Sequence, residues 1–382
     1  MGLKSLHPAW GGWISHNGNV LSLDSMLADL EYLVSIESPS HDIEAITRSA
    51  GSVRDVIERR LGRHAELVDS EAGPHVHTRF GQSSKVLIVG HHDTVFPRGA
   101  LATRPFGVSG GRATGPGVFD MKGGIVLAIH ALSLLDDLDG VELLLTSDEE
   151  VGSKASRALI EERALSCGAV LVMEPSADGG ALKTARKGTG TFEVVVHGKA
   201  AHAGLEPEKG INSLVAAAQL IIRIATFGDP EMGTTVTPTV ANAGTADNVV
   251  PAMTRVRVDA RVNVASEKER VEHLMSTLSS DVAGAGVEVS GGLERPPMPE
   301  SASTTLFTVA ESAAASEGLA VVTGVAVGGG SDGNFTAALG VPTLDGLGAI
   351  GGGAHADHEF VLVDTMIDRA RLVAAIVARL IA

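Results

Sequence analysis

Side chains that can bind metal ions or transfer protons lie directly after short apolar runs of this sequence. His91 and Asp93 follow Lys85–Gly90, Asp148, Glu149 and Glu150 follow Val141–Thr146, and Glu174 follows Ala169–Met173. Runs of this length and composition are typical of strands buried on both faces. Because ligands bind outside the carboxyl ends of the strands in open parallel sheets, these side chains are predicted to meet at one sheet edge.

Asp120, which follows the glycine-rich turn Gly115–Gly117, extends this acidic cluster. Any one of these carboxylates alone is explained equally well as a turn former or a helix cap, so the inference rests on the whole set. Carboxylates gathered in one place repel one another, and two divalent cations with a bridging hydroxide would balance Asp120, Glu150 and Glu174. Imidazole and carboxylate ligands without thiolate suit zinc, and cobalt or manganese are also accommodated.

Helical patterns alternate with the apolar runs in the first part of the chain. Two helices are expected between Ser22 and Leu61, interrupted near Ser38–Pro39, and another is expected over Lys122–Leu135. This alternation predicts an α/β domain with a mixed, mostly parallel sheet and flanking helices. Elements of the same style return after the linker-like segment Arg295–Glu300.

A different pattern occupies the segment between these two parts. Its expected order is strand, helix, strand, strand, helix, strand, over Thr191–His197, Gly210–Thr226, Thr234–Asn242, Thr254–Val262, Ser266–Leu278 and Gly286–Ser290. This order is that of a ferredoxin-like α+β domain. We therefore expect a catalytic domain at residues 1–186 and 298–382, interrupted by an inserted domain at residues 187–297.

The overall composition argues against several classes of partner. The net charge of −16 would repel nucleic acid and anionic membranes, and an aromatic content of 3% leaves few platforms for stacking bases. The one cysteine, Cys167, excludes an intramolecular disulfide. Residues 1–19 lack the apolar core of a signal peptide, and no stretch of about twenty residues is apolar enough to span a bilayer. We expect a cytoplasmic protein without nucleic-acid or membrane partners.

Five motifs in a fixed order resemble one family of enzymes. They are His91–Val95 (HHDTV), Gly115–Gly124 (GPGVFDMKGG), Thr146–Glu150 (TSDEE), Glu174-Pro175 and Gly353–His355 (GAH). The sequence is similar to the co-catalytic zinc hydrolases that include aminoacylase, glutamate carboxypeptidase, acetylornithine deacetylase and succinyl-diaminopimelate desuccinylase. The match around residues 91–106 and 115–124 is most similar to the glutamate carboxypeptidase branch. The resemblance implies a zinc-peptidase-like fold for the first domain.

The resemblance also implies a ligand set for two metal ions, with zinc as the expected metal. Asp120 would bridge the two ions. His91 and Glu174 would complete one metal site, and Glu150 and His355 would complete the other.

Asp93 and Glu149 have supporting roles in the implied mechanism. Asp93 would accept a hydrogen bond from the second ring nitrogen of His91 and so fix its tautomer. Glu149 would be the general base that takes a proton as a metal-bridged hydroxide forms, and would pass that proton to the departing amine. Adjacent Glu149 and Glu150 cannot easily reach the same metal, which agrees with one base and one ligand.

Other expected site residues lie in or near the inserted domain. His202 belongs to a GKAAHAG motif whose histidine in relatives reaches across a dimer interface and steadies the developing oxyanion, although a turn histidine is the alternative. Asn248 resembles a substrate-binding position of the family. These resemblances predict a homodimer that forms through the inserted domain.

Arg261 and the loop Gly329–Asp332 are expected to hold a substrate carboxylate. A planar guanidinium suits a carboxylate, although Arg261 shares a strand face with Asp259 and could form an ion pair there instead. Gly330 and Ser331 resemble a glycine-serine-aspartate loop of the family, whose backbone N–H groups could help to grip the same carboxylate.

The resemblance narrows the reaction further. In this family a glutamate at the position of Glu174 goes with carboxypeptidases and deacylases, whereas aspartate goes with aminopeptidases. We expect hydrolysis of an amide bond that releases a C-terminal amino acid, with glutamate as a candidate, from a small peptide or an N-acyl amino acid. An N-acyl-amino-acid deacylase breaks the same bond and stays an alternative. A metal-stabilised binding protein without catalysis is disfavoured, because Glu149 and all the expected ligands are present.

Overall fold

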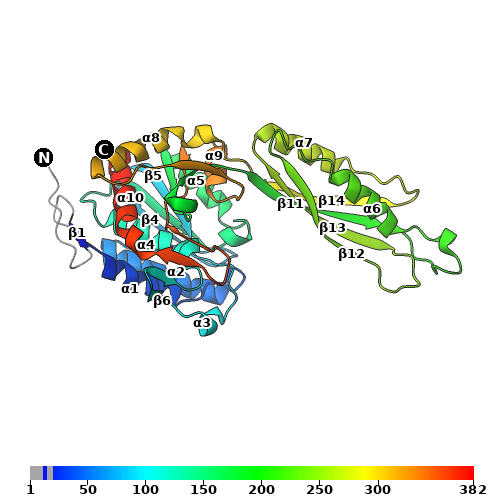
Figure 1. Cartoon of the computed structure of the whole chain (residues 1–382), viewed down its shortest axis with the longest axis horizontal. Coiled ribbons are helices and arrows are strands. Elements are labelled where there is room, and N and C mark those ends of the chain that lie inside the picture. The colour runs from blue at the N-terminus through cyan, green and yellow to red at the C-terminus, as the bar shows by residue number, and fades with distance from the viewer. Residues whose placement is uncertain (1–11, 15–19) are drawn as a thin grey trace. The chain divides into compact units, whose positions relative to one another are not determined.

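The computed structural model describes residues 12–14 and 20–382, which form two compact units (Figure 1). Unit 1 contains the described residues within Met1–Ala185, Glu300–Val327 and Ser331–Ala382, and unit 2 contains Arg186–Pro299 and Gly328–Gly330. The prediction that residues 1–19 form no signal peptide falls mostly on residues 1–11 and 15–19, which lie outside the described residues.

A six-stranded mixed sheet with the order β16-β9-β5-β8-β4-β3 lies at the centre of unit 1. Its strands are β3 (Glu66–Val68), β4 (His75–Phe80), β5 (Ser84–His91), β8 (Gly140–Thr146), β9 (Ala169–Val172) and β16 (Thr343–Leu344). The pairs β16–β9, β9–β5 and β5–β8 are parallel, whereas β4 pairs antiparallel with β8 and with β3. The predicted mixed, mostly parallel sheet is therefore confirmed.

Helices cover both faces of this sheet, as Figure 1 shows. One apolar core joins it to α1 (Leu23–Val34), α2 (Ile43–Leu61), α4 (Gly123–Leu132), α8 (Glu300–Glu317) and α10 (Met366–Ile381), and another joins it to α5 (Arg157–Ser166) and α9 (Gly333–Ala338). Along β5, Val86 and Ile88 belong to the first core, and Leu87 and Val89 belong to the second. Because side chains alternate between two buried faces, the strand sequence is continuously apolar.

The first two helices have separate side-chain caps, which explains the predicted interruption between them. The Ser22 side chain accepts a hydrogen bond from the Ser25 N–H at the start of α1, and Asp42 does the same for Ala45 at the start of α2. Gly62 ends α2 in the left-handed conformation with a φ of 61°, which costs glycine little.

Shorter elements complete unit 1. They are β1 (Gly12–Ile14) paired with β2 (Val20–Ser22), β10 (Leu182–Arg186) paired with β15 (Gly324–Val327), the small sheet β17 (Gly351–Gly352), β18 (Phe360–Leu362), β7 (Arg112–Thr114) and β6 (Gly107–Ser109), and the short helix α3 (Ala100–Thr103). Among the described residues, no helix has the length and apolar character needed to cross a membrane.

Unit 2 contains the elements that the inserted segment predicts. They are β11 (Gly188–His197), α6 (Ser213–Ile224), β12 (Thr235–Ala243), β13 (Met253–Val262), α7 (Ala265–Ser276) and β14 (Gly286–Arg295). The strands form an antiparallel sheet with the order β12-β13-β11-β14. Leu220 of α6 and Val271 of α7 share an apolar core with Val194 and Val258 of the sheet. The order of elements is ferredoxin-like, as predicted.

Candidate metal centre

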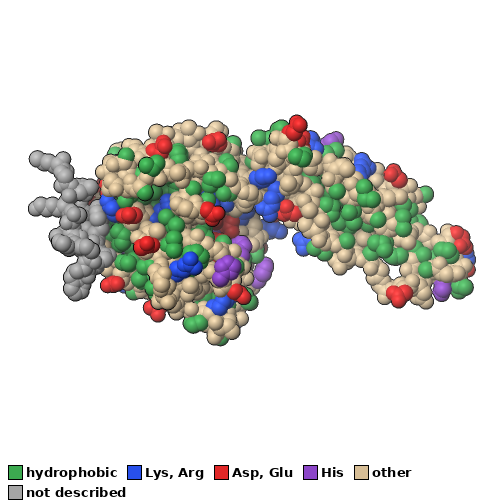
Figure 2. Space-filling view, viewed as in Figure 1, with side chains coloured by type: hydrophobic (Ala, Val, Ile, Leu, Met, Phe, Trp, Pro, Cys, Tyr) green, Lys and Arg blue, Asp and Glu red, His purple; other side chains and the backbone are tan. Residues whose placement is uncertain are grey.

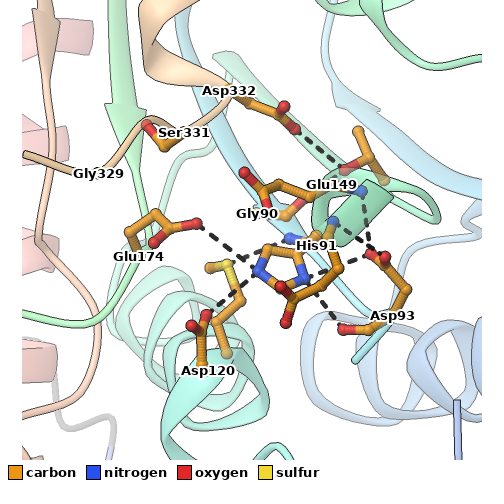
Figure 3. Close-up of polar contacts among 12 residues, drawn as sticks. Gly90, His91, Asp93, Asp120, Glu149, Glu174, Gly329, Ser331 and Asp332 are labelled. Atoms are coloured by element: carbon orange, nitrogen blue, oxygen red, sulfur yellow. Dashed lines mark hydrogen bonds and ion pairs between the residues drawn. The ribbon is translucent and has the colours of Figure 1, made fainter. Parts of the chain in front are cut away.

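Side chains at the carboxyl ends of three neighbouring strands come together in unit 1. His91 is the last residue of β5, Glu149 opens the turn η2 (Glu149–Val151) after β8, and Glu174 follows β9. Because β5 lies between β8 and β9 in the sheet, carboxylates from both neighbouring strands flank its histidine. Figure 3 shows Asp93, Asp120 and Glu174 around the His91 ring.

The two carboxylate oxygens of Asp120 face two different histidines. Its Oδ1 lies 3.3 Å from Nε2 of His91, and its Oδ2 lies 3.3 Å from Nε2 of His355. Glu174 Oε1 lies 3.6 Å from the same nitrogen of His91, and Glu150 Oε2 lies 3.0 Å from that of His355. The predicted ligands therefore form two groups, and Asp120 belongs to both.

The distances within these groups fit metal coordination. Two ligand atoms at about 2.0–2.1 Å from one tetrahedral zinc ion lie roughly 3.3 Å apart. The four separations, between 3.0 and 3.6 Å, bracket that value. In addition, Oε1 of Glu150 is buried and has no hydrogen-bond partner among the described residues. An unsatisfied buried carboxylate oxygen is costly unless a cation contacts it.

Glu149 lies close to the same cluster. Ligand atoms of Glu149, His91 and Glu174 are all within 4.8 Å of one another, as are those of His91, Asp120 and Glu150. At this separation Glu149 can act as a further ligand or as a proton carrier next to bound metal ions. Its assignment as the base therefore rests on the resemblance and on the proposed mechanism.

Asp93 is fully buried beneath the cluster and connects its parts. Nδ1 of His91 lies 3.0 Å from the Asp93 carbonyl oxygen and 3.3 Å from its Oδ1, which leaves Nε2 of the ring for a metal. The Asp93 carboxylate also accepts from the backbone N–H groups of Glu149 and Glu150, each at 3.2 Å, and from the Ser40 hydroxyl at 2.7 Å. Sequence reasoning anticipated the contact with His91 but not the other three.

The electrostatics of the cluster favour a bound cation. Burial opposes a charge on His91, but hydrogen bonds to Asp120 and Asp93 outweigh it and raise the pKa of His91 well above its ordinary value. Asp120 and Glu150 raise the pKa of His355 to about 10. Burial raises the pKa of Asp120, but His355 and His91 lower it more strongly. Protons on the two rings thus balance part of the negative charge, and a metal ion would displace them.

Glu359 is a buried residue of this region that sequence reasoning missed. Its side chain accepts hydrogen bonds from the N–H groups of Gly117 at 2.9 Å, Phe119 at 2.8 Å and Asp120 at 2.7 Å. Burial raises the pKa of Glu359 to about 7, although these donors favour its charged form. Because the partners of Glu359 are backbone groups, no motif or periodic spacing in the sequence indicates its role. Its position shortly after His355 is the feature that could have pointed to it.

Lys183 of β10 is a second neighbour that sequence reasoning missed. Its Nζ lies 4.0 Å from Oε2 of Glu174. A single lysine in a strand of mixed composition carries no pattern that would have indicated this proximity.

His202 and Asn248 lie on adjacent loop segments of unit 2. Both residues are exposed, and the Asn248 carbonyl accepts a hydrogen bond from the Ala203 N–H at 2.8 Å. Nδ1 of His202 accepts from the N–H groups of Gly204 and Leu205, each at 3.2 Å. With Nδ1 acting as an acceptor, a neutral His202 ring carries its proton on Nε2.

Arg261 forms the ion pair that was considered as the alternative to a substrate contact. Its Nε lies 3.1 Å from Oδ1 of Asp259, and its Nη1 donates to the Gly328 carbonyl at 2.9 Å. The Gly330 carbonyl accepts from Nη1 of Arg186 at 3.1 Å. The guanidinium of Arg261 is therefore held in place by groups of unit 2, while its side chain stays 39% exposed.

Ser331 forms local hydrogen bonds within unit 1. Its backbone N–H donates to Oδ1 of Asn334 at 2.9 Å, and its hydroxyl donates to Oδ2 of Asp345 at 2.6 Å. The residue is fully buried in unit 1. Local hydrogen bonds thus use both donors of Ser331 in this arrangement, and the contact of its loop with a substrate carboxylate stays a prediction.

An α/β unit with a cluster of histidines and carboxylates at the carboxyl edge of its sheet is typical of metal-dependent hydrolases. Histidine side chains also gather on the visible face of unit 1 (Figure 2). Residues 87–379 match Peptidase family M20/M25/M40, and the chain belongs to this family. The predicted metallohydrolase is therefore confirmed.

Individual relatives agree with this assignment. Carboxypeptidase G2 from Pseudomonas sp. (strain RS-16) is 32% identical over 374 residues, which cover 92% of this chain and 88% of that protein. Succinyl-diaminopimelate desuccinylase from Wolinella succinogenes is 27% identical over 299 residues, covering 74% and 80%. The crystal structure of aminopeptidase PepT from Bacillus cereus has a TM-score of 0.75 at 22% identity, covering 95% of this chain and 100% of that one. The last likeness concerns the fold alone. The family match and the likeness to carboxypeptidase G2 confirm the predicted family and branch.

Proposed function

We propose that this chain uses two divalent metal ions to release a C-terminal amino acid from a small peptide or an N-acyl amino acid. The observation that carries the proposal is the position of Asp120, whose two oxygens each lie 3.3 Å from a different histidine. His91 and Glu174 would hold one ion together with Asp120, and Glu150 and His355 would hold the other. Zinc suits this ligand set, with cobalt and manganese as alternatives.

The residues of the chain would divide the chemistry among them. Bound metal ions would supply Lewis acidity, which polarises the scissile carbonyl and lowers the pKa of water. Glu149 would take a proton from the attacking water and deliver it to the nitrogen of the leaving amine. Asp93 holds the backbone of Glu149 and so keeps its carboxylate beside the ligands. The Nε2–H of His202 would donate a hydrogen bond to the developing oxyanion.

The likeness to carboxypeptidase G2 and the glutamate at position 174 support the carboxypeptidase assignment. Arg261 would bind the free carboxylate of the substrate. That carboxylate would either replace Asp259 as the partner of the guanidinium or bind beside it. Glutamate is the candidate for the released residue. The second candidate is deacylation of an N-acyl amino acid, which the likeness to a succinyl-diaminopimelate desuccinylase favours. Both reactions break the same type of bond.

Unit 2 is proposed to form the contact of a homodimer. Its strand β12 lies at the edge of the sheet, so backbone groups on one side of β12 have no neighbouring strand in that sheet. The adjacent helix α6 exposes Leu214, Val215 and Ile222, at 47%, 49% and 71%. Figure 2 shows apolar side chains over the visible face of this unit. An open strand edge beside an apolar helical stripe suits an isologous contact with a second copy.

A substrate panel tests the proposed reaction. Purified enzyme with defined zinc or cobalt content would be assayed on N-acyl-glutamates, N-acyl derivatives of apolar amino acids, and dipeptides. We expect the highest kcat/KM on substrates that end in a free glutamate. Preference for the acyl group irrespective of the amino acid would favour the deacylase, and no hydrolysis by metal-loaded enzyme would contradict both candidates.

A mixed dimer tests whether His202 acts on the partner subunit. Glu149→Gln and His202→Ala subunits are each expected to be nearly inactive by themselves. If His202 acts in trans, random mixing restores about a quarter of wild-type activity, since half of the dimers are mixed and each has one complete site. No recovery in dimers that demonstrably exchange subunits would show that His202 acts within its own chain or not at all.

A further inference from the structure

Glu359 connects the segment that carries Asp120 to the segment that carries His355. It directly precedes β18, which pairs with β7 so that Phe360 lies opposite Thr114. This pairing brings Glu359 beside the turn that follows Thr114, and its carboxylate then spans the N–H groups of Gly117, Phe119 and Asp120.

The burial of this carboxylate needs an explanation. The Glu359 residue is 2% exposed, and its carboxylate accepts hydrogen bonds from three backbone N–H groups, with the charge of buried Lys122 also interacting with it. A buried carboxylate is expensive unless hydrogen bonds compensate it. Backbone N–H groups at 2.7 to 2.9 Å provide that compensation, and charge-assisted bonds of this length are strong. The carboxylate of Glu359, which lies on the same segment as His355, therefore holds the backbone of the Asp120 turn in its conformation.

The two proposed metal sites depend to different degrees on these hydrogen bonds of Glu359. His91 and Glu174 follow neighbouring strands of the central sheet, so their positions are set without Glu359. His355 instead lies in the loop between β17 and β18, has a φ of 63°, and exposes 54% of its side chain. In the site of His355, two of the three proposed ligands lie on segments that Glu359 holds together.

We propose that Glu359 is a positioning residue that sets the affinity of the metal site formed by Asp120, Glu150 and His355. It touches neither metal nor substrate, and acts through the backbone of Asp120 and through the loop of His355. The inference rests on the proposed two-metal function. Groups that orient metal ligands typically change metal affinity about 10- to 100-fold when they are removed.

Glu359→Gln is the variant that tests this role. It keeps the volume of the side chain and one acceptor oxygen, but turns an NH₂ group toward a backbone donor. Zinc alone would be the probe, with affinities measured by equilibrium dialysis and metal analysis. Glu359→Gln would be combined with His91→Ala, which leaves only the His355 site complete. It would also be combined with His355→Ala, which leaves only the His91 site complete.

The expected result is selective. Glu359→Gln should weaken zinc binding about 10- to 100-fold in the His91→Ala background, and much less in the His355→Ala background. An unchanged affinity in the first background, or an equal loss in both, would overturn the proposal. If Glu359→Gln does not fold, Glu359→Asp provides the same test, because its shorter side chain cannot span the same donors. A wild-type enzyme that binds fewer than two zinc ions would contradict the two-metal function itself, whatever the Glu359 variants do.

Glu142 offers a matched control for the loss of a buried carboxylate. It is fully buried in β8 and contacts His77 and Ser84, far along the strand from the carboxyl edge. Glu142→Gln should lower the thermal stability of the metal-free protein without changing the ratio of the two zinc affinities. A change in that ratio for Glu142→Gln as large as for Glu359→Gln would show that general loosening of the fold explains both.

Discussion

The two units hold their predicted functional residues in different ways. In unit 1, His91, Asp93 and Asp120 are buried at the edge of the central sheet, and both aspartates contact the His91 ring. In unit 2, His202 is exposed on a loop, and the partly exposed Arg261 pairs with Asp259. The division that we propose is that unit 1 binds the metals and transfers protons, whereas groups of unit 2 contact the substrate. Variants in unit 1 should therefore affect metal binding or the chemical step, and variants in unit 2 should leave the metals in place.

The largest effect on turnover is expected for Glu149→Gln. Loss of a general base that also returns the proton should lower kcat about 10²- to 10⁴-fold, with both metals retained. Steady-state kinetics and metal analysis on the same preparation would measure this. Glu150→Gln is the control at the adjacent position, because loss of a proposed ligand should lower the metal content as well as the activity. Turnover at the wild-type rate in Glu149→Gln would refute its role as the base.

His202→Ala should have the next largest effect on turnover, and it would distinguish the roles of the two units most clearly. Removing a donor to an oxyanion typically lowers kcat about 10²- to 10³-fold. Metal content should not change, because His202 belongs to unit 2 and the proposed ligands belong to unit 1. Loss of metal from this variant would contradict the division between the units.

Arg261→Ala should act mainly on substrate binding. Loss of charged hydrogen bonds, at about 1.5–3 kcal/mol, corresponds to a rise in KM of about 10- to 100-fold with little change in kcat. Arg255 on the same strand, which pairs with Glu193 at 3.2 Å, provides a control with a similar exposed ion pair. An equal effect of Arg255→Ala and Arg261→Ala would mean that Arg261 has only the role of a surface ion pair.

The smallest effect concerns the metal-free protein and its dependence on pH. The pKa of His355 is raised to about 10, above the ordinary value of a histidine, so the folded protein retains a proton that the unfolded chain loses. This contribution to stability is complete below about pH 6.5 and disappears as the pH rises toward 10. Thermal melting should therefore show a modest decrease in Tm over this range, and His355→Ala should flatten it. Zinc-loaded enzyme should not show this decrease in Tm, since the metal displaces the proton. If His355→Ala shows the same decrease as the wild type, a group other than His355 causes it.

The sequence predicted those parts of the site that depend on regular structure. His91, Glu149 and Glu174 could be placed because buried parallel strands are continuously apolar and end at a shared edge. His355 could be assigned only through the resemblance, since it lies in a glycine-rich loop with a left-handed backbone conformation.

Contacts between side chains and distant backbone groups could not be predicted. Glu359 binds N–H groups that are about 240 residues earlier in the chain, and Ser40 reaches Asp93 across 53 residues. Neither contact produces a periodic pattern. The hydrogen bond from the Ser331 N–H to Asn334, three residues later, was likewise not predicted. Such local hydrogen bonds compete with any role in binding a ligand.

We propose that Asp120 would be a ligand of two metal ions, each held by its own histidine. Metal content at saturating zinc, compared among wild type, His91→Ala, His355→Ala and Asp120→Ala, tests it most directly. We predict two zinc ions in the wild type, one in each histidine variant, and none bound tightly in Asp120→Ala. Two ions retained in either histidine variant, or one ion at most in the wild type, would contradict this account.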